Sequence, residues 1–523
     1  MSIFRCNVVV LVVVVVVDGP AQHKHQTHSA SIKGCSNCYP RNHRIEIERA
    51  SNVQVDDESS RPLKEKEVSA DIPSIKVLIT KSQTTDKEQF SIRTYKRRWL
   101  AVAIFILYAA PSTAQWIQYS IISNITARYY HVSVVAVDWT AITFMFFYIP
   151  FILPATWLMD HVGLRWTAIL GSGLSCLGSW IKVFSAAEDR YWVTFIGQSV
   201  VATTQVFILS APGRLAACWF GPKEVATATA LCLFGTQMGV AAGFLISPIL
   251  IGNHQDLDLV GRDFQFVFKY IAAITTFAMF IVISFFKNEP KSPPSKSRAL
   301  QKSQSNDNRE PFLTPVKRLL TNRIYLTLCN SYGFGVGVLN AVATLLNQMI
   351  LQHFKDGEQI AGQVGLLLTL MGMMGAVVSG FVIGKTHKFK ETAVIIYFLT
   401  FVGQVLFAMA MMQEILWMVY VSSMFLGFFL GNYLTLGYEL CVEYTYPEAE
   451  IVATGILNVL NNLYGIFFVL GLGKVIDTYG DFAAHVGLCS ALFVGFVITV
   501  FTKDEQRRQT VLRENKNTEA LGL

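Results

Sequence analysis

The stretch from Pro111 to Ser120 places polar and aromatic side chains inside a pattern that otherwise predicts a membrane-spanning helix. No charged residue occurs from Trp99 to Ser123, and at about 1.5 Å per residue this run is long enough to cross a hydrocarbon core of roughly 30 Å. Steps of three or four residues place on one helix face Ala109, Ser112, Trp116, Ser120 and Ser123. Because this face is small or polar apart from the indole, we expect it to contact other helices or a wet cavity.

The middles of the other apolar segments contain amides and aromatic rings but no Asp or Glu. With Trp116 and Tyr119, the candidates are Gln205, Gln237, Tyr332, Asn340, Asn347, Asn432, Asn458, Asn461 and Asn462. A cation in a low-dielectric site needs either a carboxylate or π faces and amide oxygens. Rings and amides therefore suit a quaternary ammonium ion, whose charge cannot donate a hydrogen bond and which a desolvated indole attracts by about 2 kcal/mol. For each amide the alternative is a hydrogen bond between helices with no substrate role.

The composition indicates a polytopic membrane protein. Hydrophobic residues make up 52% of the 523 residues and charged residues 15%, and the mean hydropathy is positive. The net charge of +7 comes largely from a few loops, so it indicates orientation in the bilayer and not a nucleic-acid partner. The nine cysteines form no disulfide or zinc framework, and the Cys35/Cys38 pair is interpreted as a chance spacing. No nucleophile, metal or phosphate-binding motif predicts an enzyme, a metal site or a cofactor.

Twelve apolar segments and their connections predict an all-α membrane protein of two six-helix halves. The segments are residues 99–123, 136–159, 166–184, 191–212, 225–251, 266–286, 323–352, 360–384, 392–411, 415–438, 450–473 and 483–502. The predicted divisions are a disordered cytosolic tail at 1–95, a first half at 96–286, a basic cytosolic linker at 287–322, a second half at 323–502 and a cytosolic tail at 503–523.

The distribution of Lys and Arg predicts the orientation. The linker and the loops on its side are basic, whereas the opposite loops contain acids such as Asp256 and Asp477, so both termini are expected in the cytosol, with the plasma membrane as the expected membrane. The short Val-rich run at 8–17 resembles a signal peptide, but a cleaved one would place Lys96-Arg97-Arg98 on the wrong side. Asn124-Ile125-Thr126 then faces outward and matches a glycosylation acceptor.

An internal repeat relates the two halves. The segment 221–228, which enters the fifth span, is echoed by 446–455, which enters the eleventh. The offset of about 226 residues maps the first span onto the seventh.

Several sequence motifs resemble a known family. Asp160-His161-Val162-Gly163-Leu164-Arg165 looks like a shortened form of the signature loop of the major facilitator superfamily. The runs at 115–124 (QWIQYSIISN), 154–158 (PATWL), 170–174 (LGSGL), 205–209 (QVFIL), 219–224 (WFGPKE), 344–350 (TLLNQMI) and 446–448 (YPE) resemble the feline leukaemia virus subgroup C receptor-related transporters. This resemblance extends from about residue 96 to 500 and excludes the tails.

The resemblance implies a twelve-helix facilitator that carries choline and ethanolamine, with haem export also attributed to the family. It places the amine between aromatic side chains near glutamines, and the matching residues here are Trp116, Gln205 and Met145. The sequence departs from the family at Asn340, where a tyrosine is usual, and at Asn462, where a glutamine is usual. The loss of an aromatic wall puts choline itself in question. Tyr119 and Asn347, from the rings and amides in the middles of the segments, complete the predicted substrate-binding set.

A mechanism and its alternatives follow from the charge inventory. Without an intramembrane acid or histidine relay, proton coupling is disfavoured, whereas a monovalent cation gains about 2.3 kcal/mol per 100 mV. We therefore expect a monomeric uniporter driven by membrane potential. The predicted gating residues are Asp160, Arg165, Arg214, Glu443 and Glu448, with Lys223 as a further partner. Haem export and a transport-dead receptor whose tails are active remain the alternatives, and His131, His353 and His485 lie near outer loops, far from an axial-ligand position.

Overall fold

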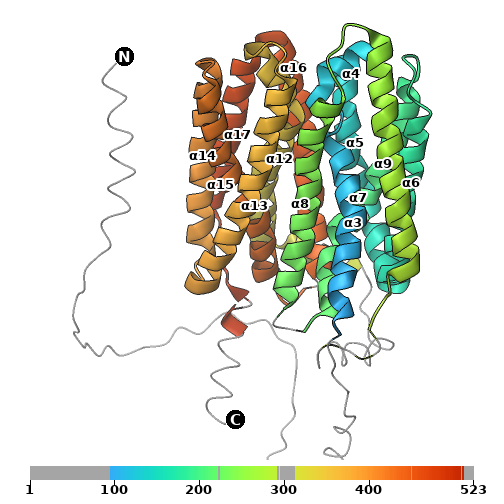
Figure 1. Ribbon diagram of the computed structural model, residues 1–523. Coiled ribbons are helices and arrows are strands. Elements are labelled where there is room, and N and C mark those ends of the chain that lie inside the picture. The colour runs from blue at the N-terminus through green and yellow to red at the C-terminus, as the bar shows by residue number, and fades with distance from the viewer. Residues whose placement is uncertain are drawn as a thin grey trace, which may run out of the picture. The chain divides into compact units, whose positions relative to one another are not determined.

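Long apolar segments separated by short polar turns form two groups of helices (Figure 1). The computed structural model describes residues 95–221, 224–290, 292, 294, 313–448, 450–507 and 509–511. The first half contains α3 (Arg97–Ile117), α5 (Val134–His161), α6 (Leu164–Val183), α7 (Tyr191–Trp219), α8 (Val225–Leu250) and α9 (Leu257–Phe285). The second contains α12 (Arg323–His353), α13 (Glu358–Thr386), α14 (Phe389–Met412), α15 (Leu416–Thr445), α16 (Glu450–Tyr479) and α17 (Asp481–Phe501).

Three shorter helices accompany the twelve long ones. The turn η1 (Ser120–Ile122) and α4 (Ser123–Tyr129) continue α3, and α11 (Leu313–Thr321) precedes α12. We call the end of the bundle at which α3 and α12 begin the linker end, and the opposite end the far end. The Val-rich run 8–17, Cys35, Cys38, Lys223 and residues 512–523 lie outside the described residues.

The predicted all-α fold of twelve long helices is confirmed within the described residues, and each predicted segment overlaps one helix. Eleven of these helices have the length and hydropathy of a membrane span. The twelfth, α6, is 20 residues long and rich in Gly and Ser, which lowers its hydropathy without shortening it. Helix α9 begins at Leu257, before the predicted residue 266, because Asp258 and Arg262 end the apolar pattern but not the helix.

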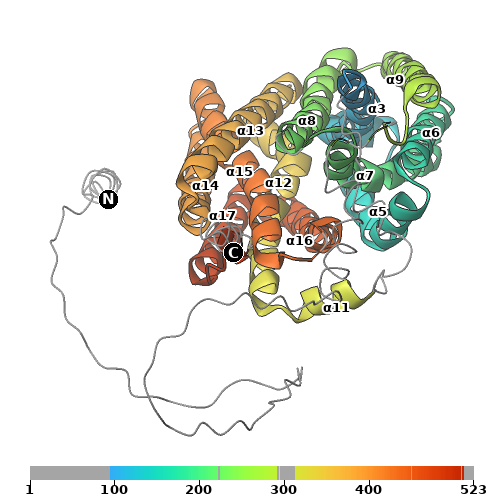
Figure 2. The same cartoon turned by 90° about the horizontal axis from the view of Figure 1, so that it is seen from below.

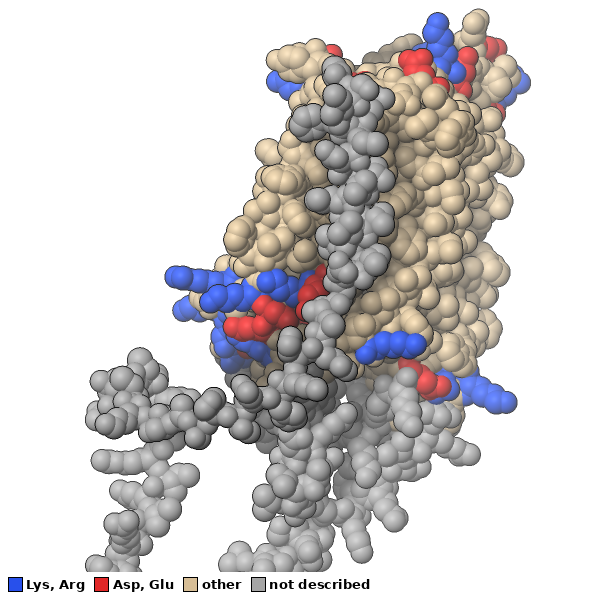
Figure 3. All heavy atoms as spheres, turned by 90° about the vertical axis from the view of Figure 1, so that its left-hand side faces the viewer, with Lys and Arg blue, Asp and Glu red and all other residues tan. Residues whose placement is uncertain are grey.

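Charged side chains on the face in Figure 3 gather at the two ends of the bundle, and an uncharged band lies between them. Such a band is what a hydrocarbon core requires, since a charge at its centre is costly. The basic side chains Lys317 and Arg318 of α11 lie at the linker end, and α11 packs on α12 and α16 (Figure 2).

Small residues allow the helices to approach closely. A Cβ on Gly239 of α8 would overlap Thr113 Oγ1 and the Ala110 carbonyl oxygen of α3. Thr113 Oγ1 also donates to the Thr236 carbonyl, at 2.9 Å. Packing of small residues and short polar contacts are the usual means by which membrane helices associate. Helix α3, which carries Trp116, is therefore fixed against α8.

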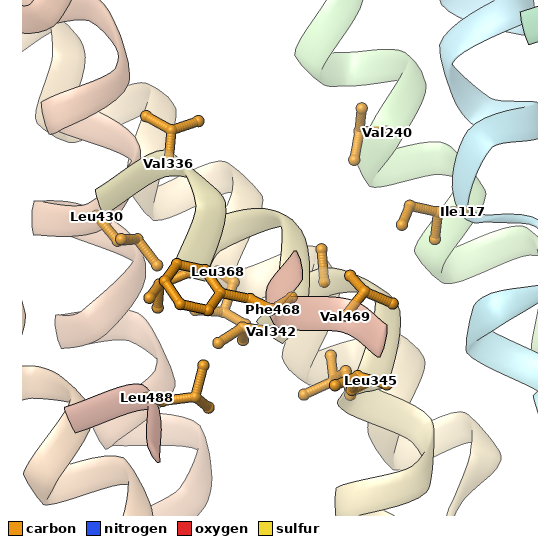
Figure 4. Packing of buried hydrophobic residues seen from close by; sticks show 14 of the residues in the cluster. Ile117, Val240, Val336, Val342, Leu345, Leu368, Leu430, Phe468, Val469 and Leu488 are labelled. Carbon is orange, nitrogen blue, oxygen red and sulfur yellow. The ribbon is translucent and has the colours of Figure 1, made fainter. Parts of the chain in front are cut away.

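The two halves meet along two equivalent interfaces, α8 against α13 and α5 against α16, as Figure 2 shows. The sequence offset maps α5 onto α13 and α8 onto α16, so the two interfaces exchange under the repeat. In Figure 4, Ile117 and Val240 of the first half lie across from the second-half residues Phe468 and Leu345. All four belong to one buried cluster or pack on it, so a shared apolar core joins the halves.

Candidate functional site

A cavity of 2210 Å³ lies between the halves. Helices α3, α5, α7 and α8 line it from the first half, and α12, α13, α15 and α16 from the second. Its wall includes Asp160, Arg214, Glu443 and Glu450, at the linker ends of their helices, whereas Asn347 at the far end is not part of its wall. The cavity therefore opens toward the linker end.

Hydrogen bonds between the halves close the far end. Asn124 of α4 and Asn253 both donate to Glu358 Oε1 of α13, at 2.7 and 2.8 Å. Gln348 Nε2 of α12 donates to Asp138 Oδ1 of α5, at 2.8 Å. Both carboxylates are buried, so these charge-assisted bonds are not exchanged for water. The conformation is open at one end and sealed at the other.

Helix α3 breaks directly after Trp116, and the break is held by α6 and α7. The helix ends at Ile117 and the chain continues as η1, which leaves backbone carbonyls without helical partners. Gln198 Nε2 of α7 donates to the Gln115 carbonyl at 2.6 Å, and Lys182 Nζ of α6 donates to Gln198 Oε1 at 3.0 Å. In a membrane bundle, a broken helix is tolerated where side chains satisfy the freed groups in this way.

The indole of Trp116, next to the break in α3, faces the cavity. Trp116 is half-buried, lines the cavity and packs on a small cluster of Phe144, Val201 and Ala202. Its Nε1 has no hydrogen-bond partner among the described residues. Because Nε1 is itself buried, the face of the ring is the part available to a cation.

Met145, Asn340 and α16 converge at the cavity. A Cβ built on Gly465 of α16 would lie 2.8 Å from Met145 Sδ and 3.0 Å from Asn340 Nδ2. The absence of a side chain at Gly465 thus allows α5, α12 and α16 to approach one another. Asn340 Nδ2 donates to Asn461 Oδ1 at 3.3 Å, and Asn462 Nδ2 donates to the Asn458 carbonyl at 2.8 Å.

The predicted substrate-binding residues separate into two groups. Those that line the cavity are Trp116, Met145, Gln205, Asn340 and Asn462. Tyr119 is fully buried behind the break in α3, where Lys182 Nζ lies 5.6 Å from its ring centroid. Asn347 lies at the far end, within hydrogen-bond distance of Ser123 and Asn124. Tyr119 therefore belongs to the scaffold and Asn347 to the far-end closure, and neither lines the cavity.

The predicted gating residues form contacts within each half in this conformation. Arg214 of α7 pairs with Asp160 of α5, and Arg165 donates to the Ile283 carbonyl at 3.2 Å. Glu448 pairs with Arg318 of α11 at 2.8 Å. Glu443 accepts from the backbone N–H of Gln509 at 2.8 Å. Among the described residues no ion pair joins Arg214 to Glu443 or Glu448, as expected for an end that is open.

The predicted glycosylation acceptor lies in the far-end closure. Asn124 Nδ2, the atom that would carry a glycan, donates to Glu358, and Thr126 of the same motif is fully buried. In the present conformation the acceptor side chain therefore contacts the second half, and a glycosylated amide would keep only one N–H for Glu358.

Sequence reasoning assigned no residue to the far-end closure, and Asn124 and Asn347 were selected for other roles. Glu358, Gln348 and Asn253 lie at helix ends or in turns, where polar residues are common, so nothing in their spacing distinguished them. The cavity wall also includes Tyr148 of α5 and Tyr438 of α15, whose hydroxyl donates to Asn458 Oδ1 at 3.0 Å.

Comparisons with known proteins agree with this architecture. The family model of the Major Facilitator Superfamily matches residues 104–469. The zebrafish (Danio rerio) choline/ethanolamine transporter flvcr2a is 40% identical over 424 residues, which is 81% of this chain and 90% of that protein. The cat (Felis catus) choline/ethanolamine transporter FLVCR1 is 41% identical over 416 residues, or 79% of this chain and 74% of that protein. This chain belongs to the FLVCR family of the Major Facilitator Superfamily.

The fold of this FLVCR-family chain also resembles solved transporters. The superfamily transporter FucP in its outward conformation covers 78% of this chain and 99% of its own, with a TM-score of 0.59 and 14% identity. At that identity the likeness concerns the fold alone. The chain is a multi-pass membrane transporter and not an enzyme.

Proposed function

We propose that this chain carries choline and ethanolamine across the membrane by alternating access, as a uniporter driven by membrane potential. The observation that carries the proposal is the cavity wall around Trp116. Its polar groups are uncharged amides such as Gln205 and Asn340, with aromatic rings beside them. This is the environment in which an organic ammonium ion is bound without a counter-ion.

The position of the carboxylates supports transport of a cation, permanent or protonated, without a proton carrier at the substrate site. The acidic residues in the described wall are Asp160, Glu289, Glu439, Glu443 and Glu450, all on the linker side of the cavity. Since proton-coupled transporters depend on an acid or histidine at the substrate site, their absence from the Trp116 region favours uniport.

The two interfaces between the halves provide the route for alternating access. The far end is closed by Glu358 and Asp138 while the linker end is open, and the repeat relates α5 against α16 to α8 against α13. Rocking of the halves would break the far-end bonds and bring Arg214 toward Glu443 and Glu448. In this proposal the linker end faces the cytosol of a cell whose plasma membrane holds the protein, because its loops are the basic ones. One chain encloses the whole cavity, so we propose a monomer as the working unit.

Uptake of radiolabelled choline and ethanolamine by cells that express Trp116→Ala tests the proposal. Loss of a cation–π contact of about 2 kcal/mol should weaken amine affinity roughly thirtyfold, whereas Trp116→Phe should retain part of the uptake. The matched control is Trp417→Ala, because Trp417 is exposed on α15 and does not line the cavity.

Surface delivery, measured in the same cells, separates binding from folding. Saturable uptake that persists in Trp116→Ala at wild-type affinity would contradict the proposal. Haem serves as the comparison substrate, and transport of haem without either amine would overturn the assignment.

A further inference from the structure

The chain that follows α17 reaches the mouth of the cavity at the linker end. Helix α17 ends at Phe501, and we call residues 503–507 and 509–511 the tail segment. Gln506 Nε2 of this segment donates to the carbonyl of His387, the residue after α13, at 3.3 Å. Gln509 is part of the cavity wall. The tail segment therefore lies on the second half, at the opening where the cavity meets the solution.

The tail segment supplies a hydrogen bond to a buried carboxylate that is predicted to act in gating. Glu443 of α15 is 2% exposed, and its Oε1 accepts from the backbone N–H of Gln509 at 2.8 Å. A buried carboxylate that loses its donor is left with an uncompensated charge, which is costly. Glu443 therefore needs either this N–H or another donor that can reach the same place.

Arg214 is the alternative partner, on the opposite wall of the cavity. Its guanidinium pairs with Asp160 in this conformation, and both Arg214 and Glu443 line the cavity at the linker end. Rocking of the halves, as proposed above, would bring Arg214 toward Glu443. Since Gln509 lines the space that this closure would remove, its contact with Glu443 and the contact of Arg214 with Glu443 belong to different conformations.

We propose that the tail segment is a latch, which favours the conformation open at the linker end because the Gln509 N–H binds Glu443 in competition with Arg214. The donor is a main-chain atom, so the contact does not depend on the side chain at position 509. A hydrogen bond to a buried charged group shifts an equilibrium by about tenfold or more. Loss of the latch should therefore raise the population open at the far end by roughly tenfold.

The neighbouring carboxylate Glu448 is held differently. Arg318 Nε of α11 lies 2.8 Å from Glu448 Oε1, but the side chain of Arg318 is 50% exposed. Water can replace either partner of such a pair, and exposed ion pairs contribute little. Arg318→Gln is therefore a matched control, because it breaks a contact of a carboxylate at the same end of the molecule with little expected effect on the equilibrium.

Gln509→Pro removes the N–H and tests the latch. The first helical hydrogen bond of the tail segment runs from Thr510 N to the Gln506 carbonyl, so the N–H of residue 509 has no helical partner and a proline is tolerated there.

Hydrogen exchange of the full-length protein in lipid nanodiscs, measured without substrate, reports on both ends. In Gln509→Pro the far-end turn 252–256 should exchange roughly tenfold faster, and the linker-end turn 162–163 should exchange more slowly. Gln509→Ala keeps the N–H, so it and Arg318→Gln should both remain within about twofold of the wild type.

A double variant identifies Glu443 as the residue through which the latch acts. In Glu443→Gln the side chain cannot form an ion pair with Arg214, so the addition of Gln509→Pro should produce no further shift. A full shift in the Glu443→Gln background would overturn the proposal. So would faster exchange at both ends, which is the result of general loosening, or unchanged exchange at either end.

Transport kinetics provide a second measurement, which rests on the proposed function. Amine outside the cell binds when the far end is open, so Gln509→Pro should lower KM for the uptake of choline and ethanolamine and raise KM for their efflux. Absence of transport of either amine would contradict the proposed function. The hydrogen-exchange comparison needs no substrate, so it would still decide whether the tail segment is a latch.

Discussion

The side chain at position 340 determines whether the middle of α12 presents an amide or a ring to the cavity. Asn340 lies beside Met145 and is nine-tenths buried, with its NH₂ group bound to Asn461. A tyrosine here would exchange an acceptor oxygen for a π face. Choline, which has no N–H to donate to the amide, should bind more tightly after that exchange.

Asn340→Tyr should tighten choline binding by roughly fivefold, because a partly desolvated cation–π contact contributes about 1 kcal/mol. The inhibition constant of choline against labelled ethanolamine measures this change. Asn340→Leu, which has neither an acceptor nor a ring, should give no gain. If choline affinity is unchanged in the tyrosine variant, or if every amine is excluded, then α12 presents another face to the substrate.

Residue type and the family resemblance together identified some of the cavity wall but not all of it. Trp116, Gln205 and Asn340 are uncharged groups in mid-span at positions that the resemblance assigns to the substrate site, and the structure places all three on the wall. Tyr119 was assigned from its type and position alone, yet the break after Ile117 changes the helical phase and turns its ring toward Lys182. Asn347 is one turn or more beyond the cavity, a difference in depth that a helical repeat does not reveal.

At the scale of elements, three helices meet at the break in α3. Lys182 of α6 is 1% exposed, and its described polar partner is Gln198 of α7, which in turn holds the Gln115 carbonyl. An ammonium buried in a membrane bundle is costly unless it is bonded. Gln198 therefore bonds both the buried Lys182 side chain and the Gln115 carbonyl at the break in α3.

Gln198→Leu should lower the free energy of unfolding by about 3 kcal/mol, since it leaves the Lys182 amine and the Gln115 carbonyl both unpaired. The melting temperature of the solubilised protein measures this loss. Lys182→Met removes the charge itself and should cost less, and adding it to Gln198→Leu should restore part of the stability. Gln413→Leu, at an exposed position after α14, is the control. Equal losses in both single variants would show that the carbonyl is not what Gln198 stabilises.

The helices themselves were largely predictable because the bilayer imposes a length and an apolar composition on each one. What the apolar pattern does not give is where a helix ends beyond the hydrocarbon. Helix α7 continues to Trp219 and α15 to Thr445, past the predicted residues 212 and 438, because the charged residues Arg214 and Glu439 end the apolar pattern but not the helix. The same extensions bring Arg214 and Glu443 to the mouth of the cavity.

At the scale of the whole molecule, the described wall around Trp116 lacks a carboxylate, which leaves the substrate's own charge to couple transport to voltage. Initial uptake of a cationic amine should fall when external potassium depolarises the cell. At equilibrium, the loss of 100 mV should lower the accumulation ratio of the amine by up to roughly fiftyfold. Uptake should survive replacement of sodium and collapse of the pH gradient at constant voltage. Uptake that stops when the pH gradient alone is removed would exclude uniport and direct attention to Glu439 as a proton carrier.

The one-ended opening of the cavity also determines where the membrane voltage acts. An aqueous vestibule conducts ions, so it takes the potential of the solution at the linker end, and the electric field concentrates in whatever low-dielectric layer remains. In this conformation that layer lies between Trp116 and the contacts of Glu358 with Asn124 and Asn253. A cation bound at the indole has then moved well into the span from the linker end but has crossed little of the voltage. Most of the membrane voltage therefore drops across the far-end closure. The electrical work of each cycle is done when its amide-to-carboxylate contacts open and the cation passes them.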